Sequence, residues 1–213
     1  AKFTAQHGFD QPIHVQFWQF LVGLAHFDLG QSIQFSRPAM DVVLQAFPTT
    51  LMLAALTLPI VITVAIVTGS LAAVRPGGVF DRVASLISLI GASTPNFWVA
   101  IVGVIVFAVT LGWLPTSGTG TPLHWVLPIV VLSLRPTGVL VQVVRSSMMT
   151  ALASVYVKTA RAKGVGKRAI VFVHALRNAL LPVITVASDQ LAGIVNGAVI
   201  VETVFGFPGI GKL

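Results

Sequence analysis

Long apolar stretches dominate the pattern of this chain and are separated by short polar segments. Residues 42–74 contain no charged side chain, and residues 83–134 again contain none. A membrane-spanning helix needs about 20 mostly apolar residues. We therefore predict four spans, within 42–74, within 83–111, at about 123–144 and at about 179–201.

Helix breakers divide these stretches. The sequence RPGG at 75–78 ends the first span, and WLPTSG at 113–118 is typical of an interfacial aromatic residue followed by a turn. Within the second span, Thr94-Pro95 predicts a kink, because proline cannot donate a backbone hydrogen bond. Before the first span, residues 11–27 have the spacing of an amphipathic helix, which we expect to end at DLG, 28–30, and to lie along the outer membrane surface.

The composition agrees with a membrane protein. Of 213 residues, 55% are hydrophobic and only 9% charged, with a mean hydropathy of +0.93. Soluble domains carry roughly 25% charged residues. So few charges cannot cover a water-exposed surface, so lipid is the expected solvent for much of the chain. Cysteine is absent, which excludes thiolate metal sites and cysteine nucleophiles.

The net charge of +7 suggests nucleic-acid binding at first, but the positions of the charges argue against it. Segments 75–82 and 145–178 carry nine Lys and Arg residues, whereas 1–41, 113–122 and 202–213 carry three. Basic residues collect in cytoplasmic loops. We therefore predict that 75–82 and 145–178 are cytoplasmic and that 1–41 and 202–213 are extracytoplasmic.

Segment 145–178 is the most informative part of the sequence. It holds seven basic residues and no acidic one. Residues 147–163 favour a helix, Gly164-Val165-Gly166 interrupts it, and 167–178 returns to helical spacing. Gly164 suits a left-handed cap. Recurring alanines would let another surface approach closely, so the segment fits either a groove on a partner protein or an anionic lipid surface.

Five motifs in order resemble one family. TARAKG at 159–164 followed by HALRNALLP at 174–182 is similar to the cytoplasmic coupling motif of binding-protein-dependent ABC permeases. FDLGQSIQFSRP at 27–38, STPNFW at 93–98, LGWLPTSG at 111–118 and VETVFGFPGIGKL at 201–213 resemble the dipeptide, oligopeptide and nickel class. The resemblance covers nearly the whole chain.

The resemblance implies an all-α, polytopic bundle of the type I ABC importer kind, with six helices per permease. Four spans are visible here, so we expect the first and last helices of the usual architecture to lie outside this chain. Residues 1–41 would form an extracytoplasmic segment with the amphipathic helix, and 42–213 the permease transmembrane domain.

It also implies a multi-pass protein of the inner (plasma) membrane that works with a second homologous permease, two ATPase subunits and an extracytoplasmic substrate-binding protein. ATP and Mg would bind the ATPase subunits; no cofactor is expected in this chain, and no nucleic acid. The coupling loop would transmit closure of the ATPase dimer to the spans. The residues to which we assign this coupling are Thr159, Ala160, Arg161, Ala162, Lys163, Gly164, Arg168, His174 and Asn178.

Other chemistry finds little support in the sequence. GFPGIGK at 206–212 lacks the spacing and the following Ser or Thr of a phosphate-binding loop, and the five histidines show no metal-ligand spacing. His174 fits a structural role better than a proton relay. We therefore expect a transport subunit and no enzyme.

Three acidic or basic residues are candidates for the translocation path. Arg135 and Asp189 fall near the middle of the third and fourth spans, where a charge is costly and usually faces a wet cavity. They either pair with each other to fix helix packing or contact the charged termini of a peptide. Glu202, at the outer end of the fourth span, either contacts the binding protein or gates the pore, or is a capping or interfacial carboxylate.

Two rival functions and the cargo stay open at this point. A secondary transporter or channel would need no ATPase and would leave the loop at 145–178 unexplained, and an intramembrane enzyme would need a catalytic constellation that the chain does not offer. Base rate favours di- or oligopeptides as cargo over glutathione, a nickel chelate or haem.

Overall fold

The fold is known from a computed structural model, which describes residues 11–26, 28–32 and 35–213. The chain divides into two units, 1–48 with Leu213, and 49–212. In the first unit, α2 (Ile13–Ala25) confirms the helix expected at 11–27, and its side chains are exposed or half-exposed. Phe27 lies outside the described residues. A two-stranded antiparallel hairpin, β1 (Gln31–Ser32) with β2 (Arg37–Pro38), then leads into α3 (Ala39–Val74).

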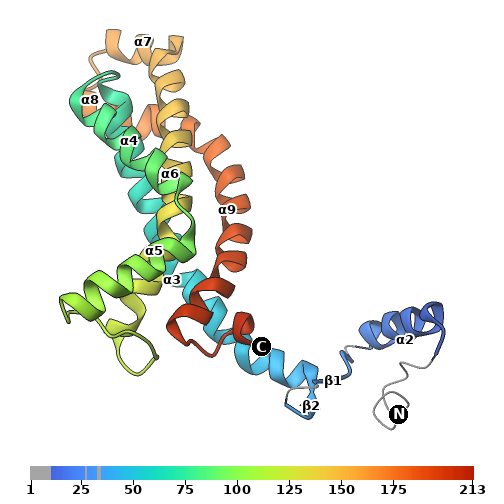
Figure 1. Ribbon diagram of the computed structural model, residues 1–213. Coiled ribbons are helices and arrows are strands. Elements are labelled where there is room, and N and C mark those ends of the chain that lie inside the picture. The colour runs from blue at the N-terminus through green and yellow to red at the C-terminus, as the bar shows by residue number, and fades with distance from the viewer. Residues whose placement is uncertain (1–10, 27, 33–34) are drawn as a thin grey trace. The chain divides into compact units, whose positions relative to one another are not determined.

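The second unit is a bundle of long helices (Figure 1). After α3 come α4 (Val79–Ser93), α5 (Asn96–Gly103), the π-helix η1 (Val104–Thr110) and α6 (Pro122–Ala153). The chain continues through α7 (Val155–Ala162), α8 (Lys167–Ala169), the π-helix η2 (Ile170–Ala175), α9 (Leu176–Phe205) and the 3₁₀ turn η3 (Ile210–Lys212). Helix α6 is central, because α4, α5 and α9 all pack against it.

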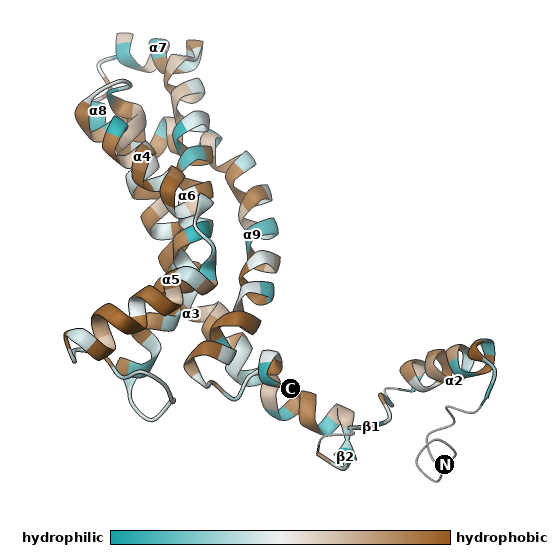
Figure 2. Ribbon diagram, viewed as in Figure 1, coloured by the Kyte–Doolittle hydropathy of each residue, from teal (hydrophilic) through white to brown (hydrophobic). Residues whose placement is uncertain are grey.

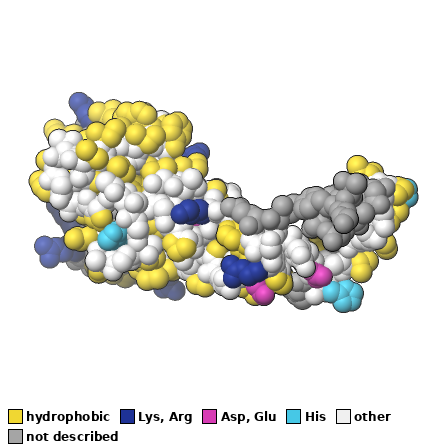
Figure 3. All heavy atoms as spheres, turned by 60° about the horizontal axis from the view of Figure 1, so that its bottom comes forward, with side chains coloured by type: hydrophobic (Ala, Val, Ile, Leu, Met, Phe, Trp, Pro, Cys, Tyr) yellow, Lys and Arg dark blue, Asp and Glu magenta, His cyan; other side chains and the backbone are white. Residues whose placement is uncertain are grey.

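Three described helical runs are long and apolar enough to cross a membrane, namely Ala39–Val74, Pro122–Ala153 and Lys167–Phe205. Hydrophobic residues dominate their ribbons (Figure 2), and hydrophobic side chains cover much of the visible face in the space-filling view (Figure 3). At 1.5 Å per residue, the 32 residues of α6 extend about 48 Å, well beyond a hydrocarbon core of about 30 Å. A helix of this length therefore extends beyond the hydrocarbon core.

The second predicted span is broken rather than kinked. Helices α4 and α5 meet at an angle of 102°. Thr94, which precedes Pro95, has the extended backbone that proline imposes on its neighbour, and its hydroxyl donates to the Ile90 carbonyl at 2.6 Å. The sequence located the disruption correctly, but a single kinked helix was wrong.

Two buried clusters fix the bundle. One joins α3, α6, α7, η2 and α9 around Leu140, Val144 and Met148. The other joins α3, α5, α6 and α9 around Leu53, Leu132 and Phe205. Phe205 and Phe207 are both buried, and Phe207 meets Trp125 edge-on with ring centroids 4.9 Å apart.

Candidate functional site

The predicted coupling segment forms the end of the bundle at which α4 begins (Figure 1). One boundary differs from the prediction. The helix expected over 147–163 is interrupted at Ser154, which ends α6 and begins α7. The Ser154 hydroxyl donates to the Ala151 carbonyl at 2.6 Å, and its extended backbone redirects the chain. Residues 147–153 are thus the last turns of α6, and α7 is a separate short helix.

Gly164 caps α7 as predicted. Its φ is +79°, the left-handed conformation that glycine adopts without a steric penalty. The Gly164 N–H donates to the Arg161 carbonyl at 3.0 Å, and the Val165 N–H donates to the Ala160 carbonyl at 3.1 Å. These two bonds form a Schellman motif, which satisfies the last carbonyls of the helix and turns the chain sharply toward α8.

One side of α7 is anchored and the other is free. Val157 is fully buried against Met148, Ala151, Ile170 and Val171. Of the coupling residues at 159–164, Ala160 is half-buried and the others are exposed. The exposed members are Thr159, Arg161, Ala162, Lys163 and Gly164. Buried Val157 therefore anchors a small, basic, solvent-facing knob, which consists of α7, Gly164 and α8, on the bundle.

The three other coupling candidates lie on the following helical run. Arg168, His174 and Asn178 are all exposed. The Asn178 side-chain amide donates to the His174 carbonyl at 3.2 Å, one turn earlier in the same run. Asn178 also shares a cavity with Tyr156 of α7. In the described part of the chain, no hydrogen bond joins His174 or Asn178 to α7.

A buried ion pair, which the sequence did not reveal, holds the base of this region. The Asp81 carboxylate of α4 accepts from Arg145 Nε and, at 2.8 Å, from Arg145 Nη2 of α6. It also accepts the Gly77 N–H at 2.7 Å, which ties down the turn between α3 and α4. Asp81 is 3% exposed. The pair links residues 64 apart in sequence, so no local pattern indicates it.

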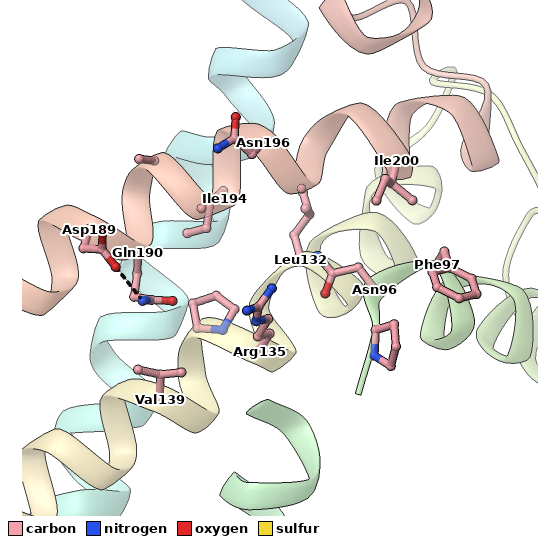
Figure 4. A pocket seen from close by; sticks show the side chains of 15 residues that line it. Asn96, Phe97, Leu132, Arg135, Val139, Asp189, Gln190, Ile194, Asn196 and Ile200 are labelled. Carbon is pink, nitrogen blue, oxygen red and sulfur yellow. Dashed lines mark hydrogen bonds between the residues drawn. The ribbon is translucent and has the colours of Figure 1, made fainter. Parts of the chain in front are cut away.

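A polar cavity of about 560 Å³ lies among α5, α6 and α9 (Figure 4). Its lining includes both charges that were predicted within the spans. Arg135 extends from α6 into the space between α9 and the start of α5, and Asp189 lies on α9 (Figure 4). No ion pair joins them in the described structure; the Asp189 carboxylate instead accepts from the Gln190 amide at 3.3 Å.

The broken span contributes to this cavity. Pro95 and Asn96, at the junction of α4 and α5, line it. Non-helical backbone at membrane depth is tolerated where it lines a cavity or is buried in protein. Sequence reasoning missed the polar residues Asn96, Gln190 and Asn196. The amides within otherwise apolar stretches were the signal that could have identified them.

Glu202 lies away from this cavity. It is fully buried, and its carboxylate accepts from the Thr50 hydroxyl of α3 and from the Gly211 N–H at 2.7 Å. The Thr50 hydroxyl oxygen in turn accepts the Ile210 N–H at 3.1 Å. The Glu202 carboxylate and the Thr50 hydroxyl together hold the segment after α9 against α3.

Comparisons with known proteins identify the family. The model of the family described as "binding-protein-dependent transport system inner membrane component" matches residues 65–213. A putative peptide transport system permease of Brucella abortus is 40% identical over the whole chain and 70% of its own length. A di/tripeptide permease of Pseudomonas aeruginosa is 36% identical over 96% of this chain and 69% of its own length. A glutathione permease of Salmonella choleraesuis is also 36% identical, over the whole chain and 70% of its own length.

These matches agree with the fold, because several apolar helical runs are what a multi-pass membrane permease requires. They also confirm the family that the sequence motifs suggested. The chain belongs to the binding-protein-dependent inner membrane components, the multi-pass permease subunits of ABC importers.

Proposed function

We propose that this chain forms the translocation path for di- or oligopeptides and couples that path to a separate ATPase subunit through the α7–Gly164–α8 knob. The observation that carries the proposal is the knob itself, which is exposed and basic and is held on the bundle by buried Val157. Peptide cargo is supported by relatives named as di/tripeptide, glutathione and oligopeptide permeases.

The proposed assembly contains a second homologous permease, two ATPase subunits that hold ATP and Mg, and an extracytoplasmic binding protein. Segments 75–82 and 145–178 face the cytoplasm, and residues 1–41 and 202–213 face outward. The shared cavity of Arg75, Arg161 and Lys167 supports this orientation, since it puts the two basic segments at the same end of the bundle.

ATP shifts the permease between inward- and outward-facing states only through contacts that differ between those states. The knob supplies such contacts from Thr159, Ala160, Arg161, Ala162, Lys163 and Gly164. Arg168, His174 and Asn178 position the helical run that connects the knob to α9. A substitution at Gly164, which fixes the shape of the turn between the two groups of residues, is therefore a direct test of coupling.

The coupling test compares two glycines in the same turn. Gly164 and Gly166 both have open space where a side chain would be built, but only Gly164 has a positive φ. In the reconstituted full complex, Gly164→Val should abolish most of the ATP hydrolysis that loaded binding protein stimulates, whereas Gly166→Val should retain it. Full stimulation in the Gly164 variant would exclude the knob as the coupling element.

Within the cavity, Arg135 and Asp189 offer opposite charges to the carboxylate and ammonium of a peptide. In Arg135→Gln, uptake of a peptide with free termini should fall at least tenfold relative to the wild type. Uptake of the C-terminally amidated form of the same peptide should be similar in the variant and the wild type. Asp189→Asn should show the same contrast with an N-acetylated peptide. Equal losses for free and blocked peptides would assign both residues to helix packing.

A further inference from the structure

A second cavity, of about 480 Å³, lies where three candidate membrane spans begin or end. Its lining includes Val74, the last residue of α3, and Leu152, the penultimate residue of α6. It also includes Lys167, the first residue of the run Lys167–Phe205. Because these helices are longer than the hydrocarbon core is thick, their ends reach past it, and we place this cavity on the headgroup side of the boundary between hydrocarbon and water.

The lining combines three cations with an apolar wall. Arg75, Arg161 and Lys167 supply the cations; the wall is formed by Val74, Leu152, Val165, Ile170 and Val171. The cavity has no acidic side chain in its lining. The one ion pair in the described part of the chain, Asp81 with Arg145, includes none of the three. Three like charges around one space repel one another and attract an anion.

We infer that this cavity binds the phosphate headgroup of an anionic phospholipid, with the phosphate among Arg75, Arg161 and Lys167 and the hydrocarbon against the apolar wall. A free phosphate would satisfy the cations but would leave the apolar wall facing water. Basic pockets between transmembrane helices on the cytoplasmic side bind such headgroups, and the cytoplasmic leaflet carries anionic lipid. The inference uses the proposed orientation but not the proposed cargo.

The bound lipid would connect the end of α3 to both sides of the coupling turn. Arg75 belongs to the turn that follows α3, Arg161 to α7 and Lys167 to α8. Near them, Val157 of α7 shares a buried cluster with Ile170 and Val171 of η2, the helix that follows α8. A headgroup held among the cations would therefore brace the knob against the rest of the bundle.

The test uses the full transporter complex, purified in detergent and mixed with phosphatidylglycerol or phosphatidylcholine, with bound lipid counted by native mass spectrometry. The wild type should retain phosphatidylglycerol in preference to phosphatidylcholine. The double variant Arg75→Gln with Lys167→Gln should weaken retention of phosphatidylglycerol about 30-fold, because it removes two cations that attract the headgroup. Arg161 is left unchanged because it also belongs to the proposed docking surface.

Two control variants make the result specific to the cavity. Arg82→Gln with Lys158→Gln removes the same two charge types from exposed positions of α4 and α7 that do not line the cavity. Arg75→Lys with Lys167→Arg keeps both charges in place. Both control variants should retain phosphatidylglycerol as the wild type does.

Three outcomes would overturn the inference. The first is unchanged lipid retention in the Arg75 and Lys167 variant, and the second is an equal loss in the Arg82 and Lys158 control. The third is displacement of phosphatidylglycerol by millimolar inorganic phosphate or glycerol 3-phosphate, which would identify a site for soluble phosphate. If the Arg75 and Lys167 variant released the ATPase subunit but retained lipid as the wild type does, the first outcome would apply. The two cations would then bind the ATPase subunit and not a lipid.

Discussion

At the scale of single residues, the buried charge of Asp81 depends on one partner. The carboxylate is 3% exposed, whereas Arg145 is 26% exposed, so removing Arg145 leaves a poorly solvated carboxylate. Removing one member of a buried pair typically costs about 3–5 kcal/mol, whereas replacing both can be nearly neutral. The Arg145→Gln variant should therefore lower the thermal unfolding midpoint of the purified permease strongly.

The double variant Asp81→Asn with Arg145→Gln is the matching control. It should recover much of the loss seen for Arg145→Gln alone, because no uncompensated charge then stays buried. If the double variant were as unstable as the sum of the two single variants, the pair would contribute no coupling energy and the interpretation would fail.

A second prediction at this scale concerns the close approach of α4 and α6. A Cβ at Gly138 would lie 2.8 Å from the Ala92 nitrogen and 3.2 Å from the Ala92 Cβ. The Gly138→Ala variant should therefore push the helices apart and destabilise the permease by about 1–3 kcal/mol. Gly193 on α9 has no neighbour within 4 Å of such a Cβ, so Gly193→Ala should be neutral or slightly stabilising. Unfolding midpoints of the two variants decide the matter, and similar midpoints would refute the packing argument.

At the scale of elements, the buried hydroxyl of Thr50 joins α3 to the end of α9 and to η3. It donates to Glu202 and accepts from the Ile210 N–H at 3.1 Å. Thr50→Val would leave both groups without this partner, at a cost of about 1–3 kcal/mol. Hydrogen exchange of the backbone amides at 206–212 should become faster, as measured by mass spectrometry.

The same helix supplies a matched control for Thr50. Thr57 is also fully buried, but its hydroxyl has no hydrogen-bond partner within the described structure. Thr57→Val should therefore be neutral or stabilising and should leave exchange at 206–212 unchanged. Equal destabilisation by the two valine substitutions would show that the hydrogen bonds of Thr50 contribute nothing specific.

The elements also show how far the sequence could predict this fold. Gly164 was predictable because a left-handed cap is a local backbone requirement, and the RPGG turn at 75–78 was predictable for the same kind of reason. The break at Ser154 was not predicted, because residues 147–163 favour a helix throughout and the chain turns where Val157 packs into the bundle. Tertiary contact overrode local propensity there.

Long-range pairing explains most of what else was missed. Pro95 indicates a disruption, but the 102° angle depends on how α5 packs against α6 and α9. Arg145 was counted only as a basic residue of 145–178 and Asp81 was not singled out, because only the fold brings the two together. Glu202 illustrates the same limit, since its partners come from α3 and from the segment that follows α9.

At the scale of the whole molecule, the fold places the knob and the loop at 117–118 at opposite ends of α9. Helix α9 begins near the knob, where η2 and α7 share a buried cluster, and its other end lies near the loop at 117–118. There the Gly118 N–H donates to the Phe205 carbonyl at 3.0 Å. The loop that contains Thr119 and the knob that contains Lys158 therefore lie at opposite ends of a helix long enough to span the bilayer.

This arrangement can be tested directly because the chain contains no cysteine. Single cysteines placed at exposed Lys158, Arg82 and Thr119 need no background removal within this subunit. With a membrane-impermeant maleimide, Thr119→Cys should react in intact cells, whereas Lys158→Cys and Arg82→Cys should react only in inside-out vesicles. The geometry of α9 predicts that Thr119 and Lys158 lie on opposite sides of the membrane, and the positive-inside rule predicts that Lys158 lies on the cytoplasmic side. Labelling of Thr119→Cys and Lys158→Cys from the same side would contradict a membrane-spanning α9. A reversed pattern would be consistent with a spanning α9 but would invert the orientation of the chain. The knob would then lie on the side opposite any cytoplasmic ATPase.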